Sequence, residues 1–175
     1  MSLIIKAAQF AADKHRGQFR KYTNTPFITH PIRVAGRVAT HLRATEALVA
    51  AAYLHDVVEN TDTSFFVIHD LFGPMVTAYV SELTDKKHEN VNREERNRLD
   101  RERIRGISDE CKVVKLIDRI DNLREMDIND PFLRIYLLES AELAIVLDGV
   151  DSDLSLELCS LIADLVLKTT ELKGK

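Results

Sequence analysis

The residues best suited to take part in chemistry are the adjacent His55 and Asp56, which stand at the end of an apolar segment, 48–54. A buried charge needs a partner, and a divalent metal ion supplies one because imidazole nitrogen and carboxylate oxygen both suit borderline or hard cations. Neighbouring side chains on a helix point about 100° apart. Both residues therefore reach one ion only if their helix lies against the site and other segments add further ligands.

Two residues elsewhere in the chain can complete such a site. His30 stands at the start of a predicted helix, and Asp118 occupies a position in the apolar pattern 113–118 where the core stripe predicts an apolar residue. The sequence therefore predicts a metal site built from His30, His55, Asp56 and Asp118.

Two more polar residues lie one helical turn from these ligands. Glu59 follows His55, and Asn122 follows Asp118, each by four positions. A carboxylate beside the ion can orient or deprotonate a water whose acidity the ion raises. We therefore expect Glu59 to act near the metal without binding it.

A second His-Asp pair, His69-Asp70, provides the alternative choice of site. No further candidate for a buried polar residue clusters near it. We therefore interpret this pair as an ordinary feature of a helix end.

The elements that must position these residues are predicted to be helices. Apolar residues recur at three- and four-residue spacing, and the chain has only 6 Gly and 4 Pro. Thr29 and Asp109 are candidate N-caps, and Gly73-Pro74 predicts a break. Residues 85–110 are rich in charge and predict a mobile loop with a solvated helix. The expected helices cover about 3–15, 30–42, 45–60, two stretches ending near 72 and 84, 110–126, one opening at Asp130-Pro131, and 154–173.

The length and charge of the chain limit the number of domains and the kinds of partner that we expect. With 175 residues we expect one domain over 1–175. The 24 Lys and Arg against 28 Asp and Glu give a net charge of −4, which disfavours nucleic-acid binding by bulk charge. No apolar run approaches the length of a membrane span, and the first ten residues lack the features of a signal peptide. We therefore expect a cytoplasmic protein with no membrane partner, and the oligomeric state stays open.

Several segments match a known pattern in order. His30, the pair His55-Asp56 and Asp118 resemble the H…HD…D signature of HD-domain metal-dependent phosphohydrolases. The wider match is to the hydrolase domains of the RelA/SpoT family and spans about residues 5–126. Its segments are 15–21 (HRGQFRK), 26–31 (PFITHP), 52–59 (AYLHDVVE), 71–73 (LFG) and 114–124 (VKLIDRIDNLR).

This resemblance implies a fold, a reaction and a cofactor. The chain resembles the single-domain Mesh-type small alarmone hydrolases, which are all-α HD-domain helical bundles. Members of that family bind one manganese ion and release pyrophosphate from the 3′ position of guanosine tetra- or pentaphosphate, and some are credited with removing the 2′-phosphate of NADPH. Other divalent ions also suit these ligands.

The resemblance also implies roles for individual residues. The four ligands predicted above would hold the metal, and Glu59 would orient the attacking water. Asn122 would hydrogen-bond the ribose or a phosphate, while Arg20 and Lys21 would line the base. Further candidate phosphate contacts are Lys115, Arg119 and Arg124.

One departure from the family pattern concerns catalysis. The family's acidic pair Glu-Asp is Glu59-Asn60 here, and an amide cannot accept a proton. Asn60 is therefore a catalytic candidate. If the family's carboxylate at this position moves a proton, replacing it with an amide would lower the rate by about 10² to 10⁴. If that carboxylate only caps a turn, the rate would change little. The alternatives are the same chemistry on another nucleotide such as NADPH, a weakly active alarmone-binding module, and a purely structural helical protein.

Overall fold

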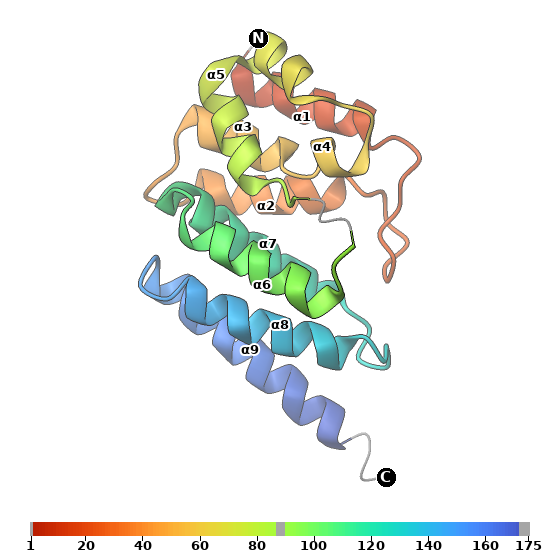
Figure 1. Ribbon diagram of the computed structural model, residues 1–175. Coiled ribbons are helices and arrows are strands. Elements are labelled where there is room, and N and C mark those ends of the chain that lie inside the picture. The colour runs from red at the N-terminus through yellow and green to blue at the C-terminus, as the bar shows by residue number, and fades with distance from the viewer. Residues whose placement is uncertain (1, 87–89, 172–175) are drawn as a thin grey trace.

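The computed structural model describes residues 2–86 and 90–171, and within these ranges it is built from nine α-helices without a β-strand (Figure 1). This confirms the all-α expectation. The helices are α1 (Leu3–Lys14), α2 (Thr29–Ala39), α3 (Glu46–Leu54), α4 (Val57–Asn60), α5 (Phe65–Leu83), α6 (Arg93–Arg105), α7 (Asp109–Glu125), α8 (Leu133–Val146) and α9 (Ser152–Glu171).

Helix α3 lies at the centre of the first part of the bundle because its sequence is apolar on every side. Its residues 48–52 and Leu54 are buried, and the helix packs against α1, α2 and α5. Three successive alanines let the neighbouring helices approach closely. Helix α7 packs against α2 on one side and α9 on the other, so it joins the first half of the chain to the last two helices (Figure 1).

The predicted helix over 45–60 is wrong in one respect, because two helices with a break at His55-Asp56 replace it. Asp56 has φ −94° and ψ −8°, which interrupts the regular helical path. The buried His55 ring donates from Nδ1 to the Ala52 carbonyl at 2.7 Å. The His-Asp pair therefore lies at a junction between α3 and α4, where both side chains can turn to the same side.

Two predicted N-caps are also wrong, whereas the predicted break is confirmed. Thr29 is the first residue of α2, and its hydroxyl donates to the Pro26 carbonyl at 2.8 Å instead of capping the helix. Ser108, and not Asp109, caps α7 by accepting a backbone N–H of the first turn. Gly73 interrupts α5 with φ 82° and ψ 175°, a conformation that a residue with a Cβ rarely adopts.

The charged segment 85–110 contains the predicted solvated helix. Within α6 only Ile104 is buried, and the helix packs mainly against α8. Residues 87–89 of this segment lie outside the described residues. Helix α6 therefore forms an outer layer against α8.

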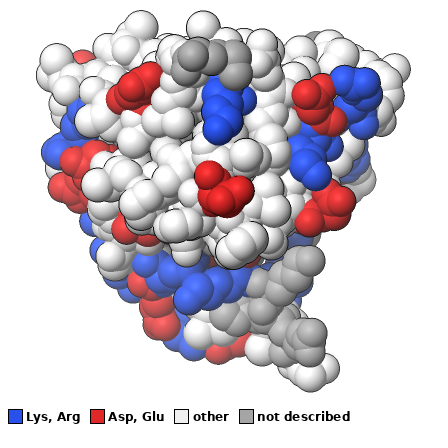
Figure 2. Space-filling view, turned by 90° about the horizontal axis from the view of Figure 1, so that it is seen from above, with Lys and Arg blue, Asp and Glu red and all other residues white. Residues whose placement is uncertain are grey.

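The surface carries charges of both signs. On the face that lies at the top of Figure 1, Lys and Arg residues are interspersed with Asp and Glu, and most of the face is uncharged (Figure 2). Among the described helices, none combines the length and apolar character needed to cross a membrane.

Candidate metal centre

Four side chains from three segments converge at one point. His30 lies in the first turn of α2, His55 and Asp56 form the junction between α3 and α4, and Asp118 lies in the middle of α7. His30 Nε2 is 3.1 Å from Asp118 Oδ1 and 3.3 Å from His55 Nε2. Asp56 Oδ2 is 3.4 Å from His55 Nε2 and 3.7 Å from His30 Nε2. The structure thus brings all four predicted ligands together.

These separations fit the coordination shell of a single ion. Two ligand atoms at about 2.1 Å from an ion stand about 3.0 Å apart at a right angle and about 3.4 Å apart in a tetrahedron. The set combines two imidazole nitrogens with two carboxylates, which suits a divalent cation of borderline or hard character. Both histidines are buried and both aspartates are mostly buried. The cluster therefore has the donor set and spacing to hold a divalent metal ion.

The hydrogen bonds of the two histidines orient their Nε2 atoms toward the ion position. His55 donates from Nδ1 to the Ala52 carbonyl, as described above. His30 donates from Nδ1 to Asp121 Oδ2 at 2.6 Å. Since an imidazole that donates from one nitrogen can use the other as a ligand, both Nε2 atoms are directed for metal binding.

Asp121, which accepts the hydrogen bond from His30, is a candidate supporting residue that the sequence analysis did not select. It is 7% exposed, and Arg33 holds its two oxygens at 2.7 and 2.9 Å. Burial raises the pKa of this carboxyl, but the bonds from His30 and Arg33 outweigh it and lower the pKa to about 2. Its position three residues after Asp118, on one face of α7, was the available signal.

A proton competes with the metal for His30. Burial lowers the pKa of this imidazole, but the hydrogen bonds to Asp118 and Asp121 outweigh it and raise the pKa to about 9. Burial raises the pKa of Asp118, and His30 with His55 and Lys115 brings it well below its usual range. Without an ion, these charges neutralise one another. A bound cation would take the place of the His30 proton.

We expect Asp121→Asn to weaken metal binding about 10- to 100-fold, because the amide removes the negative charge that orients His30 and raises its basicity. Calorimetric titration of metal-free protein with Mn²⁺ measures this change. Asp109→Asn is the matched control, since it removes the same charge from an exposed position at the start of the same helix. Equal affinity of the two variants would contradict the supporting role of Asp121.

The metal cluster opens onto a polar cavity of about 270 Å³. Helices α6, α7 and α8 complete the wall that the His-Asp junction and α4 begin. The residues lining it are His55, Asp56, Glu59, Asp85, Arg93, Asn97, Asp100, Ile104, Lys115, Asp118, Arg119, Asn122, Tyr136, Glu139 and Leu143.

Glu59 faces this cavity with an unusual protonation equilibrium. Burial and the nearby Asp85 carboxylate raise the pKa of Glu59 to about 7. The carboxylate also accepts the backbone N–H of Asp85, which holds it in place. A carboxyl whose pKa is close to neutrality can both accept and return a proton at physiological pH.

Of the predicted substrate contacts, three line the cavity. Lys115 pairs with Asp85 at 2.8 Å, and Asn122 donates to Asp118 Oδ1 at 2.7 Å. Arg119 is the third. These side chains place two cations and one amide beside the metal ligands.

The other predicted contacts do not line this cavity. Arg20 donates to Asn122 Oδ1 at 2.6 Å and to Glu125 at 2.5 Å, so it supports Asn122 from behind. Lys21 pairs with Asp130 at 2.7 Å, outside the cavity. The remaining predicted contact, Arg124, pairs with Glu157. The catalytic candidate Asn60 also lies outside the cavity, and its side chain is exposed.

The alternative pair, His69-Asp70, lies on α5. Both residues are exposed, and neither lines the cavity. The pair, interpreted above as an ordinary feature of a helix end, lies one turn before the break at Gly73.

The bundle and its cluster define a class of helical domain with a divalent-metal centre on a polar cavity. Residues 7–139 match the family model of the HD domain, and the chain belongs to this family. It is 42% identical over 130 residues to guanosine-3′,5′-bis(diphosphate) 3′-pyrophosphohydrolase MESH1 of Drosophila melanogaster, covering 73% of this chain and 72% of that protein. The human protein of the same name is 43% identical over 127 residues, or 71% of this chain and 69% of that one.

A solved structure shares the whole architecture. It is described as a metazoan ortholog of SpoT that hydrolyses ppGpp, and it superposes with a TM-score of 0.84 at 34% identity. The match covers 94% of this chain and 96% of that one.

Proposed function

We propose that this protein is a cytoplasmic, manganese-dependent guanosine-3′,5′-bis(diphosphate) 3′-pyrophosphohydrolase. The observation that carries the proposal is the cluster of His30, His55, Asp56 and Asp118 on a polar cavity, in a chain about 42% identical to proteins named for this reaction. The substrate is a guanine nucleotide alarmone that carries a diphosphate on its 3′ oxygen.

Each residue of the centre has a task in the hydrolysis. A bound divalent ion supplies Lewis acidity toward a phosphoryl oxygen and raises the acidity of water. The four ligands hold that ion, and Glu59 accepts a proton from the attacking water. Water attacks the phosphorus next to the 3′ oxygen, the bond between them breaks, and the 3′ oxygen takes up a proton as pyrophosphate leaves.

The remaining cavity residues suit a polyphosphate. Lys115 and Arg119 present positive charge, and Asn122 presents an amide that Arg20 and Asp118 hold in place. Arg20 and Lys21 stay proposed contacts of the base, and Arg124 a proposed phosphate contact. Each of these three reaches substrate only by leaving its present carboxylate.

The test is the release of pyrophosphate from guanosine tetraphosphate by metal-free protein to which Mn²⁺, Mg²⁺ or Zn²⁺ is added back. We expect turnover with Mn²⁺ and none with a chelator present. NADPH is offered in parallel and its 2′-phosphate release measured. Hydrolysis of NADPH alone would replace the proposed substrate, and hydrolysis of neither would overturn the proposal.

We expect Asn60→Asp to change kcat/KM by less than about threefold, which is typical of an exposed charge. The Asn60 side chain is exposed, and its backbone carbonyl accepts a hydrogen bond from Gln18 at 2.9 Å, which the substitution leaves intact. Pyrophosphate release by the two proteins measures the ratio. Activity that appears only in the variant would instead support the weakly active binding module.

A further inference from the structure

Arg119 brings to the cavity wall a positive charge that makes no direct ion pair among the described residues. Its guanidinium packs over the Tyr136 ring at 4.4 Å, and it donates to Ser140 Oγ at 3.3 Å. Within residues 2–86 and 90–171, no carboxylate lies within ion-pair distance of it. A partly buried cation without a paired anion is unfavourable. An anionic group that binds near Arg119 would therefore be stabilised by its charge.

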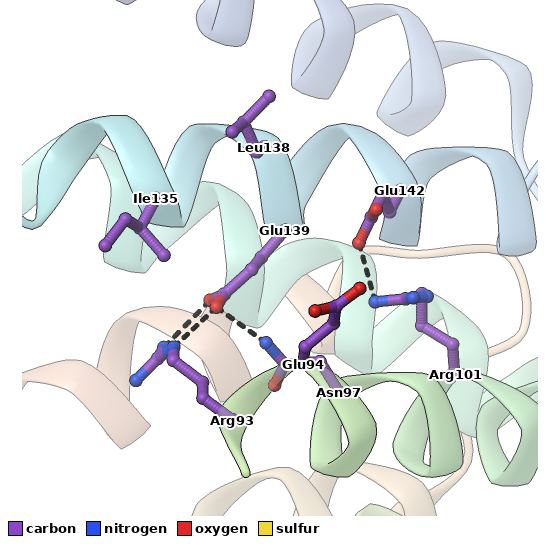
Figure 3. A pocket seen from close by; sticks show the side chains of 8 residues that line it. All are labelled: Arg93, Glu94, Asn97, Arg101, Ile135, Leu138, Glu139 and Glu142. Carbon is purple, nitrogen blue, oxygen red and sulfur yellow. Dashed lines mark hydrogen bonds and ion pairs between the residues drawn. The ribbon is translucent and has the colours of Figure 1, made fainter.

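Glu139 lies next to this cation, and hydrogen-bond donors surround its carboxylate as they would surround a bound anionic ligand. It is on α8, and its side chain is only 14% exposed. Arg93 of α6 donates to its two oxygens at 2.6 and 2.9 Å, and Asn97 donates to Oε1 at 2.6 Å (Figure 3). Burial raises the pKa of Glu139, but Arg93, Asn97 and the charge of Arg119 outweigh it and lower the pKa. The carboxylate is therefore ionised at neutral pH.

The fork of donors around Glu139 has the geometry that also binds phosphate. A guanidinium recognises a carboxylate and a phosphate through the same pair of parallel N–H groups. Arg93, Asn97 and Glu139 line the metal cavity, and the same three residues line an outer pocket of about 350 Å³ between α6 and α8 (Figure 3). The Glu139 carboxylate thus stands between the metal cavity and the surface, on donors that a phosphate could use.

We propose that Glu139 is a built-in counter-anion that competes with substrate phosphate for Arg93 and Asn97 and so sets the affinity of the site for polyphosphates. The inference rests on the proposed function for the identity of the substrate. The phosphates that are not hydrolysed displace Glu139 from Arg93 and approach Arg119. The negative charge of Glu139 opposes that approach, which weakens the binding of substrate and product.

Glu139→Gln tests the proposal because it keeps the size and the hydrogen-bonding oxygen but removes the charge. We expect KM for guanosine tetraphosphate to fall about three- to tenfold, with kcat changed less than about twofold. Raising the ionic strength from 50 to 500 mM should shrink this difference, since salt screens charges.

Glu142→Gln is the matched control. Glu142 lies one turn further along α8, pairs with Arg101 at 2.6 Å and lines the outer pocket, but it does not line the metal cavity. We expect its KM to equal that of the unaltered protein. The proposal is overturned if Glu139→Gln raises KM, or lowers it no more than Glu142→Gln does. Glu139 would then only link α8 to α6 through its ion pair with Arg93.

A second measurement separates this inference from the proposed function. Inorganic pyrophosphate is titrated calorimetrically into the metal-free form of each variant, where no turnover is needed. We expect tighter binding by Glu139→Gln than by Glu142→Gln, and weaker binding by Arg119→Gln. Equal binding by all three contradicts the role of Glu139, whereas failure of guanosine tetraphosphate hydrolysis alone overturns only the proposed substrate. Thermal melting of each variant checks that it is folded.

Discussion

Asp118→Ala is expected to remove the metal ion and to lower turnover by about 10³-fold or more, because the ion supplies both the Lewis acid and the acidified water. Asp118 Oδ1 lies 3.1 Å from His30 Nε2 and 3.8 Å from His55 Nε2, so it closes one side of the ligand cluster. Without it, two imidazoles and Asp56 remain. Metal content after dialysis against Mn²⁺, measured by atomic emission, and pyrophosphate release test the two parts of the expectation.

Asp70→Ala is the control for this substitution. Asp70 belongs to the other His-Asp pair of the chain, is exposed on α5 and lies outside the cavity. We expect its metal content and turnover to match the unaltered protein. An inactive Asp70→Ala beside an active Asp118→Ala would show that the wrong pair had been chosen as the metal centre.

Glu59→Gln is expected to lower kcat by about 10² to 10⁴ while the metal stays bound. The amide keeps an oxygen that accepts the Asp85 backbone N–H, so α4 keeps its place, but it cannot take a proton from water. Metal content and kcat, measured on the same preparation, separate loss of the base from loss of the ion. Glu142→Gln, whose side chain does not line the cavity, serves as the matched Glu-to-Gln control.

The dependence of activity on pH is a second test of Glu59 as the group that accepts the proton. Since Glu59 must be ionised to accept a proton, activity falls as the pH drops through its pKa. Burial and Asp85 raise that pKa to about 7, and a bound cation would lower it. We therefore expect an acidic limb with a midpoint at or below pH 7 and a tenfold loss per pH unit below it. A limb that persists unchanged in Glu59→Gln would assign the proton transfer to another group.

Three residues of the metal cluster could be chosen from the sequence because they interrupt or end an apolar pattern. Asp118 interrupts the apolar stripe of α7, and His55-Asp56 ends the all-round apolar run of α3. Hydrophobic periodicity depends on neighbours three and four positions away, so it reveals both the helices and their exceptions. The same locality explains why the Gly73 break was predicted correctly.

The ends of the helices were predicted less well. The break at His55 depends on a buried ring that bonds the Ala52 carbonyl, and the cap of α7 depends on which of two adjacent residues, Ser108 or Asp109, turns its side chain back to the helix. Both choices are small differences in backbone angle, which surrounding packing decides.

By itself, the sequence determined the all-helical class, the four metal ligands as candidates and the carboxylate at Glu59, since residue type and helical spacing suffice for these. Only the tertiary structure decided that Asp121 supports His30, that Asn60 faces solvent, and that Glu139 occupies the donors of Arg93 beside Arg119. Two of these relations are contacts between residues on different helices, and the third is the direction in which a side chain points. Sequence spacing leaves both open. The two pairings follow from the packing of α2 against α7 and of α6 against α8, which depends on how whole helices bury their apolar faces.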